Sequence, residues 1–333
     1  MRTADSGKAA GLRVVVLGGT GYLGRRIGEA FRADGAQVHL VSRGPDDRGG
    51  PAGEHRVRLD LLAADTRELA GFFGSVRPDV VVNAAGLVWR GDEDEMTAGN
   101  ADLVARVTEA LTPLPRPPRL IQLGTVHEYG AGTPGVGIRE DQQPAPVTPY
   151  GRTKLLGTRA VLRAAAEYGL DGVVLRLANV IGAGVPAGSL FGRIAAHLAE
   201  AARAQRLGQE PEELRLPPLR AHRDVVDVRD AVDAVRAAAT APGPGLSGRV
   251  VNVGRGAAVP MDALVHRMVE LSGVRLPVVE TASDQPSRTD AQWQQLDVSR
   301  ALRVLGWRPR RTLDASLRDL LSATVPTPVN GRT

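Results

Sequence analysis

The sequence predicts an α/β protein built on a doubly wound parallel sheet, with a second, smaller domain. Two observations lead to this prediction. Short, continuously apolar segments rich in valine and leucine recur along the first half of the chain, and helical patterns separate them. Uninterrupted apolar strands that alternate with helices are typical of a parallel sheet covered by helices on both faces. After about residue 180 the alternation fades, so the remainder is expected to form the smaller domain.

The individual elements follow in chain order. The first strand is expected at residues 12–18, and the helix after it at residues 22–35, where it ends on a glycine. Further strands are expected at residues 36–42, 55–61, 79–86, 119–124 and 172–180. Helices between them are expected at residues 66–73 and 101–111. In the smaller domain we expect a helix at residues 190–206, a strand at 249–254 and a helix at 261–271.

Composition excludes several classes of protein. The 333 residues include no cysteine, which rules out disulfides and thiolate chemistry and fits a cytoplasmic location. No N-terminal apolar run suggests a signal peptide, and no segment approaches the roughly 18 apolar residues of a membrane span. The formal net charge is only +5, and the arginines are scattered without an aromatic-rich strip, so no nucleic-acid partner is expected. We also expect no metal centre.

A glycine-rich loop follows the first strand directly. Its sequence, GGTGYLG, matches the pattern of loops that bind the pyrophosphate of a dinucleotide. The glycines allow a tight turn and a close approach of the backbone, and the next helix offers its amides and its positive dipole end. A dinucleotide cofactor is therefore expected at Gly18, Gly21, Tyr22, Leu23 and Gly24. The alternative is that the glycines only form a turn.

The end of the second strand bears on the choice of cofactor. NAD-binding proteins place an acidic residue there to hold the ribose 2′-hydroxyl, whereas this chain has Ser42 and Arg43. An arginine suits the 2′-phosphate of NADP, so NADP(H) is expected in preference to NAD(H). The alternative is that Arg43 is solvated and that Asp46 or Asp47 reaches the ribose.

A tyrosine and a lysine stand four residues apart at Tyr150 and Lys154, in a chain with only two lysines. On a helix this spacing puts both side chains on one face. A tyrosine ordinarily titrates near pH 10, and a neighbouring ammonium stabilises its phenolate and lowers its pKa toward neutrality. The pair is therefore expected to act as an acid–base couple. The alternative is that the spacing arose by chance.

The order of these and other motifs resembles the extended short-chain dehydrogenase/reductases, the NAD(P)-dependent sugar epimerase/dehydratase group. The shared motifs are GGTGYLG, NAAG, GTVHEYG, YGRTK, LRLANVIGAG, RDVVDVRD, VNVG and LDVSRALRVLGWRPRRTLDASL. The resemblance implies a Rossmann domain for NADP at residues 12–180, to which the chain returns around 224–250. Residues 181–323 are then mainly a substrate-binding domain. Residues 1–11 and 325–333 are expected to be loose termini.

The resemblance also implies roles for the catalytic residues. Thr125 stands where the family places a catalytic serine or threonine, which hydrogen-bonds the reacting sugar oxygen. Tyr150 is implied as the acid–base, and Lys154 as its partner and as a ligand of the nicotinamide ribose. Asn100 matches an asparagine in the helix beneath the site.

Further positions concern the cofactor. By resemblance, Ala84, Ala85 and Gly86 line the cofactor at the end of the fourth strand. Asp60 and Leu61, at the end of the third strand, are expected to lie at the adenine, where the carboxylate accepts a bond from the amino group. The alternative for Asp60 is that it caps the following helix.

The substrate is implied to be a nucleotide-diphosphate sugar. Asn179, Arg223 and Arg288 fall near positions that hold the diphosphate in the family. The alternative for Arg223 is an ion pair that merely ties the two domains together. His127 and Glu128 are untypical of the family; they are expected either to touch the substrate or to pack against their own loop. A homodimer is implied by the same resemblance.

Departures from the family pattern narrow the reaction. The 4,6-dehydratases carry an Asp-Glu pair directly after the threonine, where this chain has Val126 and His127, so an elimination is not expected. The 4-epimerases retain NAD, whereas Ser42 and Arg43 favour exchangeable NADPH. We therefore expect NADPH-dependent reduction of a keto group, at C4 of a nucleotide-activated deoxysugar. The alternatives are an NAD-dependent nucleotide-sugar 4-epimerase and a non-catalytic NADP-binding sensor or scaffold.

Overall fold

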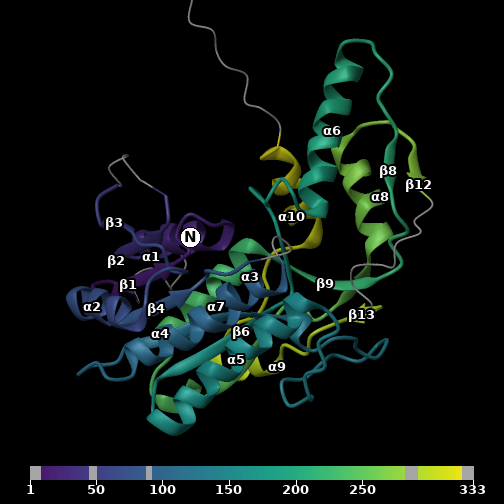
Figure 1. Ribbon diagram of the computed structural model, residues 1–333. Helices are drawn as coiled ribbons and strands as arrows, with labels where there is room; N and C mark the ends of the chain where they lie inside the picture. Colours follow the sequence, from purple (N-terminus) through teal and green to yellow (C-terminus); the bar gives the residue numbers. More distant parts are fainter. Residues whose placement is uncertain (1–8, 45–50, 88–91, 282–291, 325–333) are drawn as a thin grey trace, which may run out of the picture.

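A computed structural model describes residues 9–44, 51–87, 92–281 and 292–324 (Figure 1). Its main sheet consists of β1 (Arg13–Leu17), β2 (Gln37–Ser42), β3 (Glu54–Arg58), β4 (Val80–Asn83), β5 (Arg119–Thr125), β6 (Gly172–Leu177) and β10 (Arg249–Val253). The strands are parallel and lie in the order β10-β6-β5-β4-β1-β2-β3. Because the order reverses between β1 and β4, the sheet is doubly wound, and the predicted fold class is confirmed.

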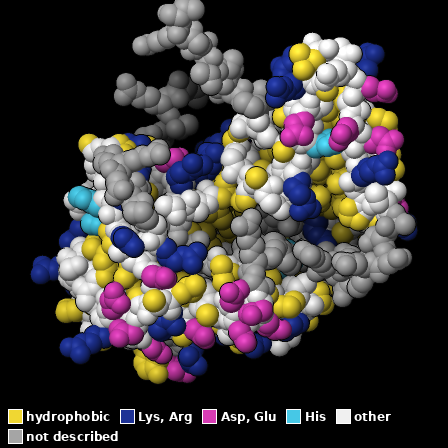
Figure 2. Space-filling view, turned by 45° about the horizontal axis from the view of Figure 1, so that its top comes forward, with side chains coloured by type: hydrophobic (Ala, Val, Ile, Leu, Met, Phe, Trp, Pro, Cys, Tyr) yellow, Lys and Arg dark blue, Asp and Glu magenta, His cyan; other side chains and the backbone are white. Residues whose placement is uncertain are grey.

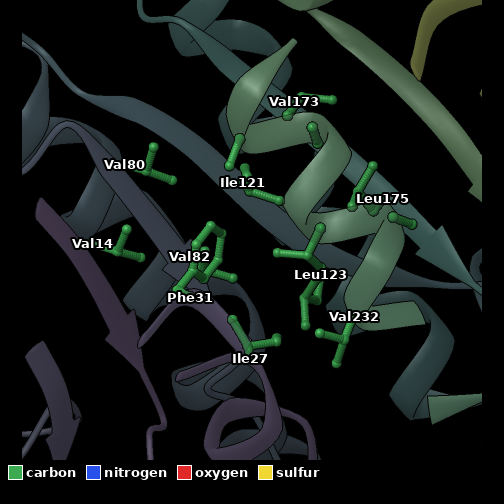
Figure 3. Close-up of a cluster of buried hydrophobic side chains, with 14 of the residues drawn as sticks. Val14, Ile27, Phe31, Val80, Val82, Ile121, Leu123, Val173, Leu175 and Val232 are labelled. Atoms are coloured by element: carbon green, nitrogen blue, oxygen red, sulfur yellow. The ribbon is translucent and has the colours of Figure 1, made fainter. Parts of the chain in front are cut away.

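Each strand serves two cores, because successive side chains point to opposite faces of the sheet. Val14 and Val16 of β1 face a cluster that includes Phe31 and Val232 (Figure 3). Val15 faces the other cluster. The helices on the first face are α1 (Tyr22–Ala33), α7 (Val228–Thr240) and α9 (Ser299–Leu305). Those on the second face are α2 (Thr66–Val76), α4 (Leu103–Leu111) and α5 (Pro149–Tyr168).

A smaller lobe stands beside the sheet (Figure 1). Its helices and outer strands are α6 (Leu190–Arg206), α8 (Met261–Ser272), α10 (Leu313–Ser322), β8 (Leu214–Leu216) and β12 (Val278–Glu280). A second sheet connects it to the main body and consists of β7 (Asn179–Ile181), β9 (His222–Asp227), β11 (Ala258–Pro260) and β13 (Trp293–Gln294). The surface is hollowed between this lobe and the main body (Figure 2). No helix in the described part of the chain is long and apolar enough to cross a membrane.

Three features differ from the sequence expectations. The strand expected at residues 249–254 in the smaller domain is β10, which pairs with β6 at the edge of the main sheet because its valines are buried there. The helix expected at residues 101–111 begins at α3 (Glu93–Thr97) and continues through a π-helical turn into α4, because a capping box starts it earlier. Residues 9–11, expected to be loose, form a turn in which Ala9 packs into the first core.

Candidate active site

The three predicted catalytic residues meet at the carboxyl end of β5. Thr125 is the last residue of that strand, and Tyr150 and Lys154 lie in the first two turns of α5. The sequence starts the helix here because the Thr148 hydroxyl accepts the N–H of Gly151 at 3.1 Å and proline occupies the first helical position. A Cβ at Gly151 would lie 2.4 Å from the His127 carbonyl oxygen, so the glycine lets α5 pack directly against the loop after β5.

Hydrogen bonds connect this group of residues. The side chains of Tyr150 and Thr125 are hydrogen-bonded to each other. Lys154 is buried, and its Nζ donates to the carbonyl oxygen of Leu123 at 2.6 Å. Gly86 lies beside it, since a Cβ built there would be 3.9 Å from the lysine Nζ. The structure thus brings the hydroxyl, the phenol and the ammonium together next to the end of β4.

Burial dominates the electrostatics of the pair. It raises the pKa of Tyr150 above its ordinary value, against the opposing effect of the hydrogen bond with Thr125. This direction is opposite to the lowering that the Tyr-Lys spacing predicts. The reason is that the phenol is largely withdrawn from water, which disfavours the phenolate more than its surroundings stabilise it. Burial also lowers the pKa of Lys154, while the charge of Glu128 acts in the opposite direction.

The predicted substrate residues lie on the lobe side of this group. The ring of His127 contacts that of Tyr150 edge-on, with centroids 5.8 Å apart, and its side chain is hydrogen-bonded to Asn179. Burial, together with the smaller effect of the nearby charge of Arg223, lowers the pKa of His127 to about 4. Arg223 is 5% exposed, and burial lowers its pKa to about 10, so it is charged at neutral pH. Arg288 lies outside the described residues.

Asp224 and Asp227, the acids that would pair with Arg223 if it only tied the domains together, are held by other groups. The Asp224 carboxylate accepts the backbone N–H groups of Arg255, Gly256 and Leu296. The Asp227 carboxylate accepts both nitrogens of the Arg229 fork and the hydroxyl of Ser316. Asp224 therefore binds the segments that follow β10 and β13, and Asp227 binds side chains of α7 and α10.

The glycine-rich loop has the form that a pyrophosphate requires. Gly18 has φ +78, and a Cβ there would lie 2.8 Å from the Ala85 backbone. A Cβ at Gly24 would lie 2.1 Å from the Gly18 carbonyl oxygen, so only glycine lets α1 start this close to β1. Tyr22 and Leu23 open α1, whose first turn has no side-chain cap and no acidic residue. This helix end therefore suits an anionic group.

The end of β2 carries the residues that bear on the cofactor's 2′ position. Arg43 is exposed directly after the strand, and Ser42 is half-buried at its end. Arg58 is the β3 partner of Ser42 in the parallel register, so a second arginine stands at the end of the neighbouring strand. The sequence does not reveal Arg58, because its position depends on the pairing of β2 with β3. Asp46 and Asp47 lie outside the described residues.

The remaining cofactor positions border the same edge of the sheet. Asp60 accepts the backbone N–H of Leu62 at 3.0 Å and closes a turn, whereas α2 is capped by Asp65 instead. Leu61 is buried in the second core. Ala84 and Ala85 are partly buried directly after β4. The side-chain amide of Asn100 holds the loop after them, accepting the N–H of Leu87 and donating to Thr153 of α5.

Comparison with known proteins identifies the family. The pattern of the NAD dependent epimerase/dehydratase family matches residues 14–254, well over half of the chain. The chain belongs to this family. The resemblance to the extended short-chain dehydrogenase/reductases is thereby confirmed.

Individual family members agree along nearly the whole length. A dTDP-6-deoxy-L-talose 4-dehydrogenase (NAD(P)(+)) of Kitasatospora kifunensis is 44% identical over 95% of this chain and 97% of its own. A UDP-glucose 4-epimerase of Azospirillum brasilense is 28% identical over 94% of this chain and 92% of its own. The solved structure of MoeE5 with UDP-glucuronic acid and NAD is 26% identical, with a TM-score of 0.79 over 94% of this chain and 98% of that one. The prediction of an NAD(P)-dependent oxidoreductase is confirmed.

Proposed function

We propose that this protein reduces the C4 ketone of a dTDP-activated 6-deoxyhexose, with NADPH as the reductant. The observation that carries the proposal is the 44% identity to a dTDP-6-deoxy-L-talose 4-dehydrogenase (NAD(P)(+)), which extends over 95% of this chain. Oxidation of a C4 hydroxyl and reduction of the C4 ketone are the two directions of one reaction. The hydrogen-bonded hydroxyl and phenol beside a buried ammonium supply the groups that such a reaction needs.

The residues at the end of β5 carry out the proton chemistry. When bound, the nicotinamide supplies the hydride that reaches the ketone carbon. Tyr150 gives its phenolic proton to the ketone oxygen, so that the carbonyl becomes a hydroxyl, and solvent then restores the proton. Thr125 donates a hydrogen bond to the same oxygen as negative charge develops on it. The Lys154 ammonium stabilises the transient phenolate.

The preference for NADPH rests on the end of β2. Arg43 is exposed there, and Arg58 stands opposite Ser42 in the register. Guanidinium groups pair with phosphate oxygens through two parallel hydrogen bonds, so both arginines suit a 2′-phosphate. The Kitasatospora kifunensis relative is an NAD(P)(+) dehydrogenase, a description that covers both forms of the cofactor.

Arg223 is proposed to hold the diphosphate of the sugar nucleotide. It is buried, and its charge lies close enough to His127, the neighbour of Tyr150, to lower the pKa of that histidine. A diphosphate held there would keep the sugar against Tyr150, and binding energy from that remote group would appear in turnover. Asn179, hydrogen-bonded to His127, is proposed to border the same subsite.

A 4-epimerase is the second candidate, because a UDP-glucose 4-epimerase is 28% identical over 94% of the chain. One experiment separates the functions: the protein is mixed either with NADPH and a dTDP-4-keto-6-deoxyhexose, or with NAD⁺ and UDP-glucose. A reductase consumes one NADPH per keto-sugar and leaves UDP-glucose unchanged. An epimerase converts UDP-glucose into its C4 epimer and regenerates NAD⁺ in each cycle, so that no NADH accumulates. A protein that binds NADPH but does neither is the sensor or scaffold, and this outcome would remove the catalytic proposal.

A further inference from the structure

Glu128 is a buried carboxylate that the mechanism above does not use. It is 0% exposed and lies in η2 (Val126–Glu128), the short turn that follows β5. Its Oε1 accepts the backbone N–H of Thr125 at 2.8 Å. Its Oε2 accepts the Thr158 hydroxyl at 2.8 Å and the Arg176 Nε at 2.7 Å. Both of its oxygens are therefore bound to groups from three different elements.

The partners of Glu128 are themselves held in place. The Arg176 side chain is 3% exposed, and its guanidinium lies 4.3 Å from the centre of the Tyr129 ring. The Tyr129 hydroxyl donates to Asn252 of β10 at 2.8 Å. A Cβ at Gly124 would lie 2.6 Å from the Glu128 Oε1, so the glycine before Thr125 makes room for the carboxylate. This network fixes the carboxylate rigidly behind the catalytic threonine.

Glu128 also lies close to the catalytic pair, because its Oε2 accepts the hydroxyl of Thr158, which is one turn after Lys154 on α5. It raises the pKa of Lys154, opposing the effect of burial, and it raises the pKa of Tyr150. The charged and titratable groups around it are Arg176 on β6, Lys154 and Tyr150 on α5, and the neighbouring Tyr129. An ammonium buried beneath a cofactor site needs a compensating anion to remain charged.

We propose that Glu128 is a positioning residue of the active site: it fixes the backbone of Thr125 and supplies the negative charge that balances the buried Lys154 ammonium. The inference rests on the proposed function, in which Thr125 and Lys154 act on the reacting oxygen and on the phenol. In this role Glu128 acts through Thr125 and Lys154 and does not contact the substrate. Loss of the Glu128 charge is expected to lower the pKa of Lys154 on α5. If Glu128 served only to hold Arg176, the pKa of Lys154 would not change.

The chain offers a direct test, because Lys154 is one of only two lysines. Protein labelled with ¹³C at the lysine ε-carbon gives two signals, which Lys154→Arg assigns, and each signal is followed against pH in the presence of NADP⁺. In Glu128→Gln we expect the Lys154 midpoint to move to lower pH while Lys8 does not move. The matched control is Glu140→Gln, which neutralises another buried glutamate of the same network, paired with Arg300 and bonded to the Asn252 N–H. The control is expected to leave the Lys154 midpoint unchanged.

A second variant covers the case in which Glu128→Gln fails to fold. Glu128→Leu combined with Arg176→Met replaces the pair by apolar side chains, a change that buried ion pairs often tolerate. Of the two charges that it removes, that of Glu128 is the one that acts on the pKa of Lys154, so the Lys154 midpoint is expected to move in the same direction. A Lys154 midpoint that matches the wild type in either folded variant, or that moves equally in Glu140→Gln, overturns the proposal.

Activity provides the second readout. With the keto-sugar as substrate, Glu128→Gln is expected to lower kcat about 10- to 100-fold through misplacement of Thr125, with little change in KM. An unchanged kcat in Glu128→Gln would contradict the claim that Glu128 positions Thr125. If the wild-type protein does not reduce any keto-sugar, the proposed function fails, but the lysine titration still decides the part of the inference that concerns Glu128 and Lys154.

Discussion

His127 makes the free energy of unfolding depend on pH, and its contribution can be measured separately from those of the other titratable groups. Its pKa falls from 6.5 to about 4 in the folded chain, because burial and the charge of Arg223 disfavour the imidazolium. Between these values the unfolded chain binds a proton that the folded chain excludes, so the free energy of unfolding declines as the pH falls. At about 1.4 kcal/mol per pKa unit, the decline is about 3 kcal/mol across the range and about 2 kcal/mol at pH 5.

The perturbation is His127→Phe, which keeps an aromatic ring next to Tyr150 but cannot take up a proton. It removes the hydrogen bond with Asn179 at every pH and therefore destabilises the protein by a constant amount. Urea unfolding at pH 7.5 and pH 5 gives the difference in free energy between wild type and variant. We expect this difference to shift by about 2 kcal/mol in favour of the variant at the lower pH.

His266→Phe is the control, because that histidine is exposed on α8. Other acids titrate in the same range, but they do so in all three proteins and cancel in the differences. The reasoning is refuted by a difference for His127→Phe that is the same at both pH values. A shift of the same size in His266→Phe would refute it equally, because the effect would then not arise from burial.

Three further predictions concern activity and binding. Tyr150→Phe is expected to abolish most turnover while NADPH still binds, and near-normal rates of NADPH oxidation would contradict its role as proton donor. Arg43→Ala is expected to weaken NADPH by about 1.5–3 kcal/mol and NADH very little, as measured by fluorescence titration. Equal losses for both cofactors would contradict the 2′-phosphate assignment. Arg223→Ala is expected to remove calorimetric binding of dTDP and UDP by the NADP-bound protein; binding indifferent to the substitution would remove this arginine from the site.

The parts of the fold that follow from local pattern could be predicted. The apolar runs of β1 and β4 and the glycine loop lie within a few residues of where the sequence places them, because burial on both faces and the tight turn are local requirements. β10 was misplaced, because its run of valines does not reveal which sheet it joins. Its place beside β6 follows from long-range packing, including α9 against its outer side.

The same limit applies to the site. The spacing of Tyr150 and Lys154 predicts a shared helix face, since four residues make about one turn. It does not predict that α5 packs so closely on β5 that Lys154 reaches the Leu123 carbonyl and that burial raises the pKa of Tyr150. Arg58 was missed for a similar reason, because only the register of β2 and β3 places it opposite Ser42. Chemistry that depends on strand pairing and on burial is therefore visible only in the folded chain.

The raised pKa of Tyr150 bears on the direction of the reaction. A phenol that is withdrawn from water and lies close to the Glu128 carboxylate is protonated at neutral pH, which is the form that donates a proton to a ketone. An epimerase begins by oxidising a hydroxyl, and for that step the same residue has to be a phenolate. The cost of forming the phenolate rises with its pKa, so the raised pKa of Tyr150 supports the proposed reduction over a cycle that starts with oxidation.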